Sequence, residues 1–187
     1  CVHLCSMILG SMGLLGDGPT DNQTDTARPI PPKGSPLSLE QQESLEQNLW
    51  SLEQDLQDAR NALVTHPELA RHLSDIEVFH DAVETALAYG EFFAPEKEYG
   101  QAQEQLDLAA RRLTHLLDGD PAWLRQTCLV ARGYVSRIDD SIQPYGLVIP
   151  KSWRPGQPGP LRLDIWFHGR GEKLTELSFL NQRLHNS

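Results

Sequence analysis

The spacing of the apolar residues changes near Gly119, and this change restricts the chain to folds that join helices to strands. Across residues 38–118, leucine and alanine recur at helical intervals of three and four residues. Residues 128–138 and 141–150 are instead rich in β-forming residues, with a short polar turn between them that suits a hairpin. We therefore expect an α+β chain, in which an antiparallel helical bundle precedes the first strands of a sheet.

One apolar seam predicts a first helix that starts after Ser38 and ends near His66. Ser38 suits the N-cap position, with Gln41 as its capping-box partner, and Pro67 disfavours helix at the residue before it. The seam consists of Leu45, Leu49, Leu52, Leu56, Ala59 and Leu63. Because the opposite face of this helix is lopsidedly acidic, the seam indicates a bundle core rather than a coiled coil.

Two further helices are expected before the strands begin. Asp75 is a candidate N-cap for the first of them, and Gly90 is a natural stop. Pro95 fits the first turn of the second, which should end at Gly119. Their apolar stripes are Ile76, Phe79, Val83, Ala86 and Leu87, and then Leu106, Ala109, Leu113 and Leu116 or Leu117.

Charge separates the same two regions. The chain has a formal net charge of −10, but residues 38–118 hold 17 acids and 5 bases, whereas residues 119–187 hold 6 acids and 9 bases. We expect an acidic helical domain over 38–118 and a second domain over 119–187. The acidic balance argues against nucleic acid or an anionic membrane as a partner bound by bulk electrostatics.

The first 37 residues have a different character. Residues 4–15 form an apolar run of signal-peptide length, shorter than the roughly 20 residues that a membrane span needs. A polar, Pro/Gly-rich stretch follows up to residue 37 and is typical of a linker. The run predicts a signal-peptide remnant and a secreted or periplasmic protein without a stable membrane span; a short buried or frayed helix is the alternative.

The cysteines and three of the histidines do not show the spacings that are typical of metal ligands. The three cysteines include no Cys-x-x-Cys pair. His66, His72 and His80 are six and eight residues apart, so no two imidazoles lie one helical turn apart. We expect these histidines to be surface or boundary residues, and we expect no metal or organic cofactor.

The most informative motif lies at the end of residues 161–169. This run alternates and then becomes continuously apolar, which predicts a strand buried on both faces. His168, Gly169, Arg170 and Gly171 close this run. Glycines allow a sharp turn that exposes backbone N–H groups, and one such donor stabilises the anion of a tetrahedral intermediate by about 3–4 kcal/mol. A glycine-rich turn between a strand and a helix is the alternative interpretation.

Residues 127–184 place this motif in a longer pattern. The pattern comprises RIDDS at 137–141, QPYGLVIP at 143–150 and WFHGRG at 166–171. It resembles secreted bacterial serine hydrolases of the α/β-hydrolase superfamily, in the esterase and prolyl-oligopeptidase-like group with an N-terminal helical extension. Asp140 departs from that pattern, which prefers glycine there.

The resemblance implies hydrolysis of a small-molecule ester or a peptide through an acyl-enzyme on serine. The backbone N–H groups of Gly169, Arg170 and Gly171 would form one side of the oxyanion hole, and His168 would order the loop. The sequence contains no Gly-x-Ser-x-Gly elbow, and in this superfamily the triad follows the oxyanion loop. We therefore expect a truncated N-terminal portion of a hydrolase that is inactive by itself.

Two other roles are compatible with the sequence. The acidic helical bundle could be a non-enzymatic secreted interaction module, with the strands as a small accessory sheet. Alternatively, the helices at 38–118 could form a lid or a substrate-selecting lobe over the active site of the larger enzyme. The sequence identifies neither the substrate nor the oligomeric state.

Overall fold

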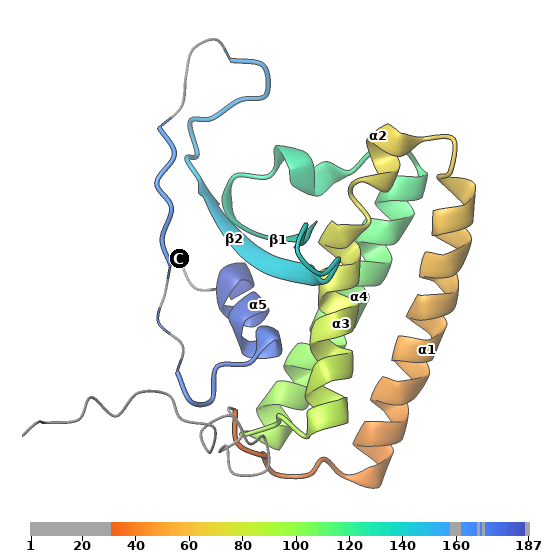
Figure 1. Ribbon diagram of the computed structural model, residues 1–187, viewed down its shortest axis with the longest axis vertical. Helices are drawn as coiled ribbons and strands as arrows, with labels where there is room; N and C mark the ends of the chain where they lie inside the picture. The colour runs from red at the N-terminus through yellow and green to blue at the C-terminus, as the bar shows by residue number, and fades with distance from the viewer. Residues whose placement is uncertain (1–30, 158–161, 168, 170, 186–187) are drawn as a thin grey trace, which may run out of the picture.

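The computed structural model describes residues 31–157, 162–167, 169 and 171–185. Three long helices, two strands and a C-terminal helix make up most of this part of the chain, and Figure 1 shows α1, α3 and α4 side by side. The elements are α1 (Leu39–Ala62), α2 (Pro67–Ala70), α3 (Ser74–Tyr89), α4 (Pro95–Leu117), the 3₁₀ turn η2 (Ala122–Arg125), β1 (Cys128–Val135), β2 (Ile142–Ile149) and α5 (Glu176–His185). The described fold is therefore α+β and rich in helix, with one two-stranded antiparallel sheet.

Helix α1 confirms the prediction made from its seam and its cap. The Ser38 hydroxyl accepts a hydrogen bond from the Gln41 backbone N–H at 3.2 Å, and Gln41 Oε1 accepts one from the Ser38 N–H at 3.1 Å. All six seam residues are buried, and the most exposed of them is Leu49 at 8%. Reciprocal capping and one continuous apolar stripe thus fix both the start and the orientation of this helix.

Helix α3 begins differently from the prediction. Leu73 occupies the N-cap position without a side-chain cap, and Asp75 lies inside the first turn with only 1% of its surface exposed. Asp75 is therefore not the N-cap, because its carboxylate accepts hydrogen bonds from β1 and from Trp123 instead. The other end agrees with the sequence, since Gly90 ends the helix in the left-handed conformation at φ 65°.

Strands β1 and β2 form the predicted hairpin, but β1 ends at Val135 rather than at residue 138, so the connection spans residues 136–141. Cys128 pairs with Ile149 at the open end, and Val135 pairs with Ile142 next to the turn. The Ser136 N–H donates to the Ser141 carbonyl at 2.8 Å and closes the loop. Local hydrogen bonds therefore fix the register of this pair.

The hairpin packs directly on the helical bundle. A Cβ atom at Gly133 would lie 2.0 Å from the Ser74 carbonyl oxygen, so β1 approaches α3 as closely as only glycine permits. Ser74 Oγ also donates to the Gly133 carbonyl at 3.1 Å. Helix α5 adds Leu177 and Leu180 to the same hydrophobic core, and Figure 1 shows this helix beside the hairpin. Helices and hairpin thus share one core, and the domain boundary near Gly119 stays a prediction.

Candidate functional site

The two described residues of the predicted oxyanion loop lie on the surface of the structure. Gly169 and Gly171 are exposed and belong to no helix or strand, and a Cβ atom at Gly169 would meet nothing within 4 Å. His168 and Arg170 lie outside the described residues. The geometry therefore neither assembles nor excludes an anion site formed by these backbone N–H groups.

The predicted strand over 161–169 is wrong for the six residues described there without a gap, 162–167. They form neither helix nor strand, and the side chains of Trp166 and Phe167 are 87% and 91% exposed. Within the described chain, only β1 and β2 form a sheet. A strand that is apolar on both faces becomes buried only between neighbouring layers, and the described residues supply none for this run.

The segment nevertheless keeps a strand-like alternation of side chains. The Arg162 guanidinium contacts the Asp164 carboxylate at 2.8 Å, a pairing two residues apart that suits extended chain. Leu163 and Ile165 alternate with these charges and are 76% and 68% exposed. An extended apolar segment thus precedes the glycine motif without a partner surface among the described residues.

A buried charge cluster connects the hairpin to the helices. The Asp75 carboxylate accepts hydrogen bonds from Trp123 Nε1 at 3.0 Å, from Arg132 Nε at 2.7 Å and from the Gly133 N–H at 3.1 Å. His72 lies 3.6 Å from the same carboxylate, and burial lowers its pKa despite that neighbour. These contacts tie α3, η2 and β1 together and suit a structural role.

Arg112 of α4 completes this cluster. Its guanidinium lies over the rings of Phe79 and Trp123, at 5.0 and 5.3 Å from their centroids. It donates to the carbonyls of Asp75 at 2.8 Å and of Ala131 at 3.0 Å. Burial lowers the pKa of Arg112 to about 10. No sequence pattern predicts this cluster, because α3, α4, η2 and β1 contribute its members from distant parts of the chain.

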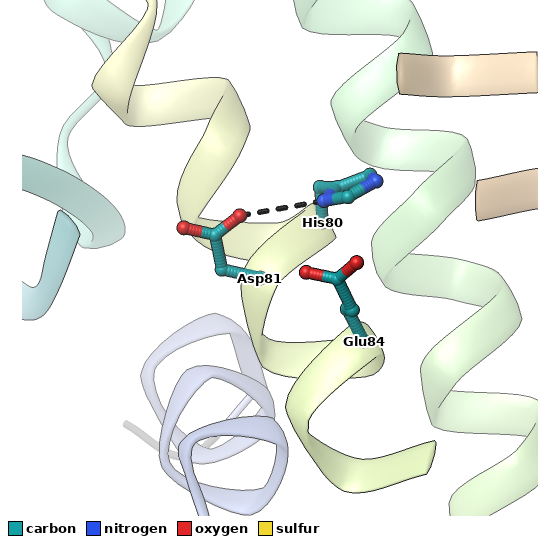
Figure 2. Close-up of side chains that lie close together, drawn as sticks. All are labelled: His80, Asp81 and Glu84. Carbon is teal, nitrogen blue, oxygen red and sulfur yellow. Dashed lines mark hydrogen bonds and ion pairs between the residues drawn. The ribbon is translucent and has the colours of Figure 1, made fainter. Parts of the chain in front are cut away.

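One group of metal-ligating side chains lies elsewhere on α3. Figure 2 shows His80, Asp81 and Glu84 with their polar ends turned toward a common point, and the potential ligand atoms all lie within 4.8 Å of one another. His80 Nδ1 is 3.3 Å from Asp81 Oδ1. The spacing between the histidines does not reveal this group. The spacing between His80 and Glu84 does, because residues four apart lie one turn apart on a helix.

The comparisons with known proteins give no relative. No protein-family model matches the chain, and no curated protein and no solved structure does so either. Among the described helices, none is both long enough and apolar enough to cross a membrane.

Proposed function

We propose that this chain is the N-terminal portion of a serine hydrolase of the α/β-hydrolase type, which cleaves an ester or peptide bond. Within it, the backbone N–H groups of Gly169, Arg170 and Gly171 form one side of the oxyanion hole, and His168 orders that loop. The serine nucleophile and its acid and histidine partners follow later in the same protein.

The order of elements around the glycine motif supports this proposal. A confirmed hairpin, β1–β2, precedes a loop rich in proline and glycine, and the apolar run 162–167 follows. Helix α5 begins at Glu176, five residues after the last glycine of the motif. An oxyanion loop of this type joins a strand to a helix through a glycine-rich turn, and the proposal requires 162–167, which form no strand here, to become that strand within the larger sheet.

Exposure of the run 162–167 is the observation that carries the proposal. Burying one large apolar side chain contributes about 1.5–3 kcal/mol, and Leu163, Ile165, Trp166 and Phe167 leave that contribution unused in the described structure. A segment of this composition gains most when strands on both sides and layers on both faces cover it. The proposed hydrolase sheet supplies that environment.

In the proposed reaction, this part of the protein stabilises the transition state. An acyl-enzyme forms when a serine oxygen attacks the substrate carbonyl, and negative charge develops on the carbonyl oxygen. Backbone N–H groups that already point at this oxygen stabilise the charge without reorganising during the reaction. Loss of one such donor typically lowers kcat by about 10²–10³.

An active-site label tests the proposal in the source organism. An epitope tag placed within residues 151–157, a described and mostly exposed loop, would allow purification of the product of the native gene. That product should react covalently with a fluorophosphonate probe, and substitution of the labelled serine should abolish both labelling and hydrolysis of p-nitrophenyl acetate. A tagged product that never reacts with the probe would overturn the proposal.

The isolated 187-residue chain serves as the matched control, since it contains no Gly-x-Ser-x-Gly elbow. It should hydrolyse p-nitrophenyl acetate no faster than buffer does. Turnover that a serine-directed inhibitor blocks would contradict the assignment of the triad to later residues.

The second candidate is a non-enzymatic interaction module, and the surface of α1 favours it. Its solvent face carries Glu40, Glu43, Glu46, Asp55 and Asp58, all of them exposed. Such a face suits a basic partner, whose binding would weaken as added salt screens the charges. A source-organism product that lacks probe labelling but retains a basic partner on purification would favour this module.

A further inference from the structure

The geometry points to a divalent transition-metal site on α3, formed by the imidazole of His80 and the carboxylates of Asp81 and Glu84. This inference is independent of the proposed hydrolase activity. It assigns a ligand of stated chemistry, a borderline cation such as Zn²⁺, to a group of side chains with no other assigned role.

The distances suit a single ion. In a tetrahedral Zn²⁺ site, ligand atoms about 2.1 Å from the ion lie about 3.4 Å apart. The three candidate atoms lie within 4.8 Å of one another. Side-chain rotation that closes the widest of these gaps by about 1 Å would complete the site. Figure 2 shows that all three side chains come from consecutive turns of one helix, so the backbone need not move.

The donor set selects the class of metal. One imidazole nitrogen with two carboxylate oxygens is a combination found in Zn²⁺ sites, whereas Mg²⁺ and Ca²⁺ prefer oxygen ligands alone. Three protein ligands also leave at least one position for water.

The three side chains differ in their burial, and the differences favour binding of a metal ion. The side chain of His80 is only 8% exposed and is therefore held in place by packing, while Asp81 is half-buried and Glu84 is exposed. A fixed imidazole reduces the cost of ordering the site, and the exposed carboxylate leaves a path for the ion from solvent.

Electrostatics around the group also favour a cation. Glu53 of the neighbouring helix α1 interacts electrostatically with His80. On helix α5, Glu176 interacts electrostatically with Asp81. Negative potential therefore extends beyond the three ligands, and a bound divalent ion would offset it.

Titration with Zn²⁺ by isothermal calorimetry tests the inference on the full chain at pH 7.5. We expect one site whose affinity falls at least about tenfold in Glu84→Gln and in Asp81→Asn. Both substitutions remove a ligand charge at positions that are exposed or half-buried, and circular dichroism would verify that the fold is intact. Co²⁺ should give a ligand-field absorption spectrum in the wild-type chain that both variants lose.

A matched control separates this site from an ordinary histidine–carboxylate pair. His66 Nδ1 lies 3.3 Å from Glu68 Oε1, but both side chains are more than half exposed and no third ligand is near among the described residues. Glu68→Gln should leave Zn²⁺ affinity unchanged. No Zn²⁺ binding by the wild type, or equal binding by all four proteins, would overturn the inference.

Discussion

The helices at residues 39–117 and the apolar run at 162–167 have equally pronounced sequence patterns, but they behave differently in the structure. The leucine seam of α1 is buried, whereas the side chains of the run are exposed. A helix makes its own backbone hydrogen bonds and needs only one facing stripe, which α1, α3 and α4 provide for each other. A strand needs partners on its edges and layers on its faces, and a local pattern cannot supply them.

The largest expected effect comes from removing Asp75, which connects the helices to the hairpin. Asp75→Ala leaves Arg132 without its buried partner, and the Trp123 and Gly133 N–H groups lose their acceptor. We expect the free energy of unfolding to fall by about 3–5 kcal/mol, as measured by urea titration with circular dichroism. The exposed Asp107→Asn is the control and should stay within about 0.5 kcal/mol of wild type. A loss below about 1 kcal/mol for Asp75→Ala would show that the hairpin docks without this cluster.

Truncating one side chain in each region tests the contrast in burial directly. Leu56 has no exposed surface, so Leu56→Ala should cost about 2–5 kcal/mol of unfolding free energy. Phe167 is 91% exposed, so Phe167→Ala should change stability by less than about 0.5 kcal/mol. The same urea titration compares the two, and a loss above about 1 kcal/mol at Phe167 would mean that the run is packed in solution.

Adding a methyl group at two glycines probes the contact between the helices and the hairpin. At Gly133, a Cβ atom would collide with the Ser74 carbonyl of α3, so Gly133→Ala should destabilise the chain by about 1–3 kcal/mol. At Gly100, inside α4, nothing lies within 4 Å, so Gly100→Ala should stabilise it by about 0.5–1 kcal/mol. Differential scanning calorimetry should therefore show shifts of opposite sign, and a stabilised Gly133→Ala would mean that β1 lies farther from α3.

The smallest expected effect is on the pH dependence of stability, and it comes from Glu176 of α5. Burial, with Asp81 and Glu91 nearby, raises the pKa of Glu176 above its ordinary value of 4.5. As the pH rises through 4.5, the unfolded state loses this proton before the folded state does, so wild-type stability falls relative to Glu176→Gln. The variant should be the more stable protein at pH 7 and match wild type near pH 3. A difference that is constant with pH in urea titrations would contradict this.

Features that neighbouring residues determine were predictable from the sequence, whereas contacts between distant residues were not. Ser38, Gly90 and Pro95 act on backbone near to them in the chain, so caps and stops placed the helix ends within a few residues. The hairpin was also predictable, because its loop is short. Asp75 was assigned to a cap because its tertiary donors, Trp123 and Arg132, lie 48 and 57 residues away. The group at His80 combines one histidine with two carboxylates, so the spacing between histidines does not reveal it.

Hydrogen–deuterium exchange of peptides that cover residues 162–171 tests the proposal that this segment forms a strand only within a larger sheet. Peptides from the isolated 187-residue chain should exchange there as fast as unstructured chain, while peptides from α1 and the hairpin are protected. In the tagged product of the native gene, we expect strong protection of the same segment. Equally fast exchange in both proteins would contradict it.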